Sequence, residues 1–249
     1  MKGKYATEET FTAGVAFAEQ VLEKKVISLR NDHHGYLADP IFEGMAAIIQ
    51  WDINTGQDLV ELPQVFELLT ANPFKVLDRT GHMPYTECAK HLGQALPAHD
   101  RLKSIYNQEG RHYPQWIEDL EKSGRIGINS KEQEGFFKWS GVANREKITG
   151  VYNPKSKSYI AITEINHLDY WSLSEATALD YRESTIKGIS GLIRIAESDD
   201  KGGKTFRRYV IPIMLYALDL IQDCYATPAD IDSSTKVGLR FKYGLCEII

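Results

Sequence analysis

A long apolar stripe near the C-terminal end of the chain is the feature that most restricts the fold. Between residues 205 and 224, apolar side chains recur every three or four positions, at Phe206, Val210, Ile213, Ala217 and Ile221. This spacing places them on one face of an α-helix, which must be covered by other parts of the chain. Because Pro212 lies inside the stripe, we expect either a kink there or a helix that begins there.

A second long helix is predicted just before this stripe. Ser172-Leu173-Ser174-Glu175 has the pattern of a capping box, which is typical of a helix start. A helix from Ser172 to Glu197 would be about 39 Å long at the usual helical rise. Gly202-Gly203 then indicates a turn. We therefore expect residues 172–197 and 205–224 to pair as an antiparallel helical hairpin.

Two further segments have the patterns of β-strands. The β-branched and aromatic runs 148–152 and 159–165 flank a polar, proline-containing turn, which predicts a β-hairpin over about 148–165. Residues 237–246 alternate apolar and polar side chains, which predicts a half-buried terminal strand. Between residues 59 and 140, prolines and glycines divide the chain into short helices.

These patterns together predict an α+β fold that is predominantly α-helical, with the β-hairpin, the long C-terminal helical hairpin and the terminal strand. The length of 249 residues fits a single domain over residues 1–249. The alternative is a division into a helical part, 1–140, and a part with the two hairpins, 141–249.

The composition is that of an ordinary globular protein, with 43% hydrophobic and 25% charged residues. Three scattered cysteines without a CxxC pair favour reduced thiols and hence a cytoplasmic location. The longest apolar run, Tyr209 to Ile221, is shorter than the roughly 20 residues that span a bilayer. We therefore expect no membrane partner, and because no apolar core follows Lys2 and Lys4 we expect no signal peptide.

A basic and aromatic segment at 131–159 is the strongest candidate for a binding surface. The net charge of the chain is −5, but residues 101–157 carry 11 Lys and Arg against 7 Asp and Glu. Cations interleaved with aromatic rings are typical of surfaces that hold single-stranded nucleic acid. The candidate binding residues are Lys138, Trp139, Arg145, Lys147, Tyr152, Lys155 and Lys157. The sequence thus predicts a binding or assembly subunit that contacts a macromolecular partner, protein or nucleic acid, with the five cations on one face and Trp139 or Tyr152 partly exposed.

The competing hypothesis is a metal-dependent phosphoesterase or nuclease. Asp32-His33-His34 resembles the Asp-His-His signature of a family of metal-dependent phosphoesterases, although that family needs an aspartate-bearing strand well upstream and only 31 residues precede Asp32 here. The resemblance implies that Asp32, His33 and His34 hold a divalent metal. Glu164-Ile165-Asn166 resembles the E-x-K motif of restriction-type nucleases, in which acids hold Mg²⁺, but asparagine replaces the lysine.

Two other local patterns have simpler interpretations. His99-Asp100 resembles the paired ligand of HD-type phosphohydrolases, but Asp100 also suits the start of a helix. Gly203-Lys204-Thr205 resembles the end of a phosphate-binding loop, but the glycine required five residues earlier is Ser198. Because no catalytic pattern is complete, the sequence predicts no cofactor and no metal.

The apolar stripe generates a stability prediction. If Ile213 lies in the core, Ile213→Ala should lower the free energy of unfolding by about 2–5 kcal/mol, because it removes buried methyl and methylene groups and leaves a cavity. Urea unfolding followed by circular dichroism measures this loss, and a loss well below this range would place Ile213 outside the core.

Overall fold

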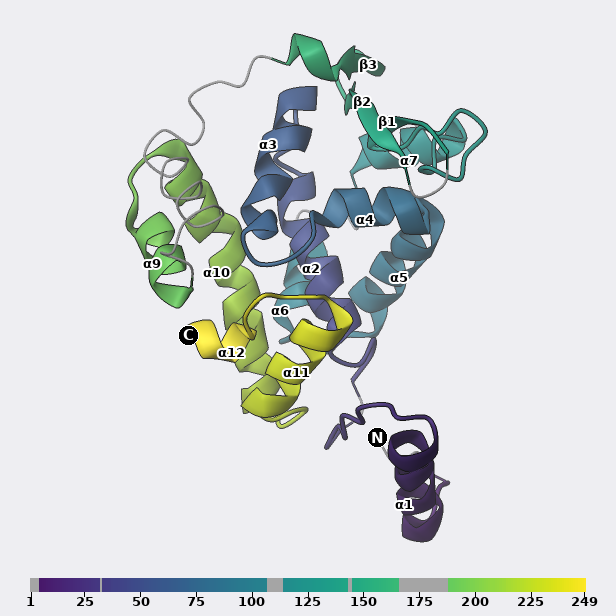
Figure 1. The fold of residues 1–249 in the computed structure, drawn as a ribbon, viewed down its shortest axis with the longest axis vertical. Coiled ribbons are helices and arrows are strands. Elements are labelled where there is room, and N and C mark those ends of the chain that lie inside the picture. The colour runs from purple at the N-terminus through teal and green to yellow at the C-terminus, as the bar shows by residue number, and fades with distance from the viewer. Residues whose placement is uncertain (1–4, 32, 107–113, 143–144, 166–187) are drawn as a thin grey trace.

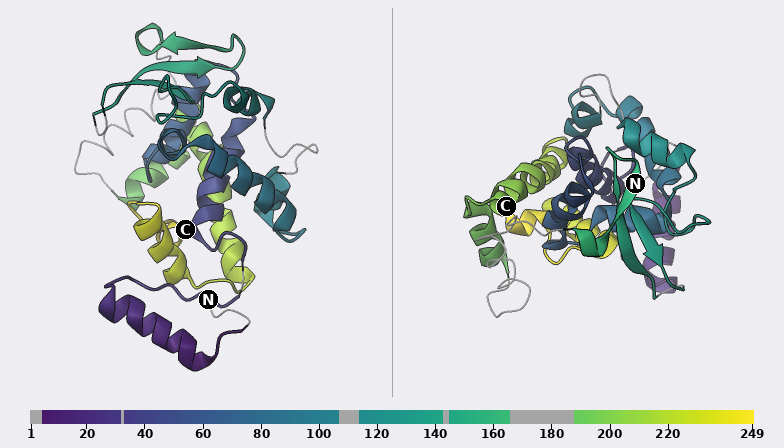
Figure 2. Two further views of the ribbon diagram at one scale, coloured as in Figure 1. Left: turned by 90° about the vertical axis from the view of Figure 1, so that its right-hand side faces the viewer. Right: turned by 90° about the horizontal axis from the view of Figure 1, so that it is seen from above.

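The computed structural model describes residues 5–31, 33–106, 114–142, 145–165 and 188–249, and it shows a body of packed helices with a small antiparallel sheet at one end (Figures 1 and 2). The α+β, predominantly helical fold class is therefore confirmed. The N-terminal half contains the helices α1 (Glu8–Ala16), η1 (Phe17–Val21, a π-helix), α2 (Ala38–Gln50), α3 (Gly56–Glu67), α4 (Pro73–Thr80), α5 (His82–Ala95), α6 (Arg101–Tyr106) and α7 (Gln115–Lys122). The C-terminal half contains β1 (Phe137–Ser140), β2 (Lys147–Asn153), β3 (Ser158–Ala161), the short 3-10 turn η3 (Ile162–Glu164), α9 (Ile189–Glu197), α10 (Lys201–Gln222), α11 (Pro228–Gly238) and α12 (Leu245–Ile248).

Helix α10 carries the apolar stripe found in the sequence, and it packs against α2, α3 and α9. Ile213 and Ala217 are buried, as expected. Pro212 does not delay the helix, which begins at Lys201 with the Asp200 side chain accepting the Gly203 N–H at 2.8 Å. None of the described helices is long and apolar enough to span a bilayer.

The predicted turn between the two long helices is shorter than expected. Gly202 and Gly203 belong to the first turn of α10, and only residues 198–200 separate it from α9. A side chain at position 203 would clash with the carbonyl oxygens of Ser198 and Ile195, so glycine allows the end of α9 to lie directly on α10. In the first predicted helix, 172–197, residues 172–187 lie outside the described part of the chain.

The predicted terminal strand at 237–246 is wrong. Thr227 and Asp230 form a capping box that starts α11, which runs to Gly238, and the chain then turns into α12. Arg240 has a left-handed backbone, with φ of +56°, which no extended strand accommodates. Phe241 and Leu245 are buried. These two residues therefore anchor the connection after α11 and the start of α12 in the core, and they do not belong to a strand.

The predicted β-hairpin is confirmed between β2 and β3, with Val151 opposite Ile160. It is shorter than predicted, because the chain leaves β3 at Ala161 and continues as η3. The sheet also contains β1, which pairs antiparallel with β2 and which the sequence did not predict. The order is β1-β2-β3.

A buried carboxylate joins this sheet to the helices. Asp78, on α4, is fully buried. It accepts hydrogen bonds from the backbone N–H groups of Phe136 (2.8 Å) and Phe137 (2.9 Å) and from the Trp139 indole (2.8 Å), and its Oδ1 lies 2.7 Å from His82 Nε2. Side chains at Gly127 and Gly135 would collide with Asp78. The segment before β1 therefore lies directly against α4.

The N-terminal helix, α1 continued by η1, lies apart from the rest of the molecule (Figures 1 and 2). Thr7 caps it by accepting the Thr10 N–H, and Glu8 and Glu9 lie in its first turn, where the helix dipole favours acids. None of its residues is buried. It therefore contributes little to the core.

Replacing the buried carboxylate should be severely destabilising. Asp78→Ala leaves two backbone N–H groups and an indole N–H without an acceptor in the interior, so we expect a loss of about 3–5 kcal/mol in the free energy of unfolding. The control is Asp199→Ala, since the Asp199 side chain is almost fully exposed, and we expect its effect to stay within about 0.5 kcal/mol. Equal losses in the two variants, measured by urea unfolding, would contradict a central role for Asp78.

Candidate functional site

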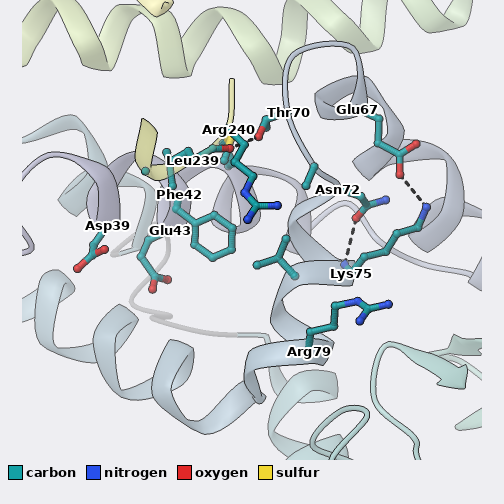
Figure 3. A pocket seen from close by; sticks show the side chains of 14 residues that line it. Asp39, Phe42, Glu43, Glu67, Thr70, Asn72, Lys75, Arg79, Leu239 and Arg240 are labelled. Carbon is teal, nitrogen blue, oxygen red and sulfur yellow. Dashed lines mark hydrogen bonds and ion pairs between the residues drawn. The ribbon is translucent and has the colours of Figure 1, made fainter. Parts of the chain in front are cut away.

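A cleft of about 800 Å³ lies between α2, α4 and the end of α11 (Figure 3). Helix α2 supplies Asp39, Phe42, Glu43 and Met45, the end of α3 and the following connection supply Glu67, Thr70, Ala71 and Asn72, α4 supplies Lys75, Val76 and Arg79, and the end of α11 supplies Gly238, Leu239 and Arg240. The wall of the cleft thus combines residues 39–79 with residues 238–240, which are far apart in the sequence.

Asn72 and Pro73 start helix α4 beside the cleft. Asn72 caps the helix, because its side-chain oxygen accepts the N–H groups of Phe74 (3.0 Å) and Lys75 (3.3 Å), and Pro73 occupies the first helical position. Lys75 and Arg79 are four residues apart, so both reach the same face of α4. The helix that carries Asp78 inward therefore presents two cations to the cleft.

The part of the wall formed by residues 238–240 is held in place by hydrogen bonds between residues about 170 positions apart in the sequence. The Thr70 hydroxyl donates to the Leu239 carbonyl, and the Lys242 N–H donates to the Leu69 carbonyl at 2.8 Å. These contacts fix the connection after α11 against the α3–α4 connection. Arg240 is thereby placed over the middle of the cleft (Figure 3).

Charges are segregated within the cleft, with Asp39 and Glu43 at one end and Lys75 and Arg79 towards the other (Figure 3). Lys75 forms an ion pair with Glu67 at 2.7 Å. Arg79 lies 3.6 Å from Glu146, and its guanidinium is 5.2 Å from the centre of the Trp139 ring. Arg240 is exposed and forms no ion pair with any residue of the described part of the chain. It is thus the cation most available to a ligand.

An apolar wall adjoins these cations. The side chains of Phe42, Met45, Val76 and Leu239 line the same cleft. Burial raises the pKa of Asp39, because it disfavours the charged form of the carboxyl group. The arrangement therefore suits a ligand that combines an anionic group with an apolar group.

The aromatic residues of the predicted binding segment belong to the core. Trp139 is 5% exposed and Tyr152 is 2% exposed, so the expectation that one of them would be partly exposed is wrong. The Trp139 indole donates to Asp78, and the Tyr152 ring packs against those of Trp116 and Tyr159. The rings are buried because β1 and β2 pack their apolar faces inward.

The predicted binding cations are spread over the sheet. Lys138 pairs with Glu134 at 2.9 Å and Lys157 with Asp119 at 2.7 Å. Arg145 is exposed in the connection before β2. Lys147 begins β2, whereas Lys155 and Lys157 follow its other end, about 20 Å away for a strand of this length. These cations therefore do not gather at one point.

The predicted metal-binding residues also lie apart. His33 is buried, and its Nε2 lies 3.4 Å from Asp100 Oδ2, while the His34 ring meets that of His91 edge-on. Glu164 is exposed in η3, and Asp32 lies outside the described residues. Within the described ranges, no three His, Cys, Asp or Glu side chains gather as a metal site.

The other two local patterns have structural roles. Asp100 caps α6 by accepting the Leu102 N–H at 2.8 Å, whereas His99 turns away to Asp223 at 3.2 Å. The pair thus points in two directions. Gly203-Lys204-Thr205 lies in the first turn of α10.

Two curated proteins match most of this chain. No protein-family model matches the chain. A protein of Rickettsia felis is 26% identical over 238 residues and one of Rickettsia prowazekii is 24% identical over 240 residues. Both are named "Putative fatty acid oxidation complex trifunctional enzyme". Each match covers 94% of this chain, but the chain spans only 29% of the length of these relatives.

A solved structure has a similar fold. The crystal structure of 3-hydroxybutyryl-CoA dehydrogenase from Escherichia coli K12 aligns with a TM-score of 0.53 over 98% of this chain and 58% of that protein. At 16% sequence identity, this likeness concerns the fold alone.

These comparisons overturn the functional prediction made from the sequence. The hypotheses of a nucleic-acid-binding or assembly subunit acting through residues 131–159, and of a phosphoesterase or nuclease, are wrong, because the relatives that match nearly the whole chain are named as fatty acid oxidation enzymes. Sequence reasoning missed the cleft because its residues extend from Asp39 to Arg240 and form no local motif. The only local signals were the Asn72-Pro73 helix start and the four-residue spacing of Lys75 and Arg79.

The raised pKa of Asp39 generates a prediction about pH. Asp39→Asn should raise the free energy of unfolding at neutral pH, because it removes a partly buried charge. The gain should be complete above the raised folded-state pKa and should vanish below the ordinary value of 3.8, where Asp39 is protonated in both the folded and the unfolded chain. Urea unfolding of both proteins between neutral pH and about pH 3 measures the gain. A gain that grows as the pH falls would contradict the assignment.

Proposed function

We propose that this chain is the helical part of a 3-hydroxyacyl-CoA dehydrogenase of fatty acid oxidation. We also propose that it binds a CoA thioester in the cleft. The names of the two Rickettsia relatives and the fold of the E. coli 3-hydroxybutyryl-CoA dehydrogenase support the class of protein. The cleft supports the class of ligand.

The observation that carries the proposal is the pairing of cations with an apolar wall in one cleft. A CoA thioester has anionic phosphates at one end and an apolar acyl group at the other. Arg240 and Lys75 can form charge-assisted hydrogen bonds with the phosphates. Phe42, Met45 and Val76 provide a surface on which the acyl chain loses contact with water. The volume of about 800 Å³ is within the range of small-molecule sites.

The dinucleotide that dehydrogenases use does not fit the residues described here. Such cofactors bind beyond the carboxyl ends of parallel strands, beside a glycine-rich turn and a helix N-terminus. The sheet in the described ranges is antiparallel and three-stranded. We therefore assign no hydride-transfer step to this chain and restrict its role to holding the thioester.

Two further proposals concern the whole chain. We propose that residues 1–249 form a single domain, and the packing of α10 from the C-terminal half against α2 and α3 from the N-terminal half supports it. We also propose a cytoplasmic location. The free thiols of Cys88, Cys224 and Cys246 suit a reducing compartment.

Calorimetric titration with butyryl-CoA tests the thioester site. We expect saturable binding that Arg240→Gln weakens by about tenfold, because a charge-assisted hydrogen bond is lost. The matched control is Arg194→Gln, since Arg194 is exposed on α9 and does not line the cleft. Phe42→Ala should weaken the binding of butyryl-CoA more than that of free CoA, since only the thioester has an acyl group. Absence of binding by the wild type, or equal affinities of the two arginine variants, would refute the proposal.

A further inference from the structure

The acidic end of the cleft belongs to one helix and lies apart from the cations. Asp39 and Glu43 are four residues apart on α2, so both reach the same face of that helix. Glu43 is buried in the wall of the cleft. The Phe42 ring lies between these two carboxylates and the cations (Figure 3). The cleft therefore has an acidic end and a basic end, with an apolar surface between them.

The electrostatic effect of the two carboxylates reaches a neighbouring helix. The pKa of the Cys88 thiol on α5 is raised, first by burial and then by the charges of Glu43 and Asp39. The start of α2 opposes this potential, because a helix N-terminus carries about half a positive elementary charge. Two carboxylates together outweigh that partial charge. The acidic end of the cleft is thus a region of negative potential.

The cations determine the direction in which a CoA thioester would lie in the cleft. They come from α4 and from the connection after α11, and they attract the phosphates. The Phe42 side chain, which would cover the acyl group, comes from α2, the helix that also carries the acids. A thioester bound in this way extends its acyl group away from the cations. The far end of the acyl group then approaches Asp39 and Glu43.

We infer that Asp39 and Glu43 make the cleft selective for acyl groups with an uncharged far end, and that they exclude acyl groups that end in a carboxylate. The inference rests on the proposed thioester site and adds the residues that determine its specificity. A carboxylate at the acidic end would lose part of its hydration and would face like charges, and both effects weaken binding. An uncharged apolar end has neither disadvantage and is covered by Phe42.

Calorimetric titration with pentanoyl-CoA and glutaryl-CoA tests the inference. The acyl groups of these thioesters have equal length and end in a methyl group and a carboxylate, respectively. The wild type should bind glutaryl-CoA about tenfold or more weakly than pentanoyl-CoA. Glu43→Gln should reduce the ratio of the two dissociation constants by about threefold or more, because one of the two repelling charges is removed. Asp39→Asn should reduce the ratio in the same direction, and it disturbs the packing less, since Asp39 is more exposed than Glu43.

Glu87→Gln is the matched control. Glu87 is an exposed acid on α5 whose charge also acts on Cys88, but it does not line the cleft. Its replacement should leave the ratio of the dissociation constants unchanged. Circular dichroism shows whether each variant is folded.

The possible failures are distinguishable. Equal affinities of the wild type for the two thioesters, or a ratio that neither Glu43→Gln nor Asp39→Asn changes, would overturn the selectivity and leave the thioester site in place. Tighter binding of glutaryl-CoA would also overturn it, because a cation such as Arg240 would then hold the carboxylate. If neither thioester binds, the proposed site itself is refuted, and the selectivity with it.

Discussion

The carboxylate of Asp78 determines how the two kinds of secondary structure in this protein are joined. A carboxylate without exposure to water is strongly destabilising unless hydrogen-bond donors replace the lost solvation. Here the donors are two consecutive backbone N–H groups at Phe136 and Phe137, the Trp139 indole and the neighbouring His82 ring. His82 lies on α5, and the other donors lie at residues 136–139, at and just before β1. Their hydrogen bonds to Asp78 on α4 therefore fix the position of the sheet relative to the helices.

The cleft depends on the same interaction because α4, which carries Asp78, also carries two of the cations that line the cleft. Lys75 and Arg79 reach the cleft from the helix whose Asp78 side chain holds the sheet. Arg79 also lies over the ring of Trp139, whose indole nitrogen donates to Asp78. A shift of the sheet would therefore move a cation that lines the cleft. Core packing and the electrostatics of the candidate site are thus linked by a single helix.

The elements that could be predicted from the sequence have local causes. The stripe of α10 and the hairpin of β2 and β3 depend on periodicity and turn composition, which the sequence records directly. Strand β1 could not be predicted in the same way, because it is short and is fixed by pairing with β2 and by distant contacts with Asp78. Phe241 and Leu245 fit the alternation of a strand, yet Phe241 lies in an irregular connection and Leu245 begins α12. The cleft, built from segments far apart in sequence, left no pattern.

The cleft is formed by residues 39–79 and 238–240, which are synthesised at different times. Helices α2 and α4 are synthesised before the segment after α11, in which Leu239 and Lys242 meet the α3–α4 connection at Thr70 and Leu69. Contacts between such distant segments form slowly, because a long loop must close before they stabilise anything. A nascent chain that has already packed α2 against α4 would still have an open groove there. The cleft is therefore complete only after the segment that follows α11 has been synthesised and has packed against the α3–α4 connection.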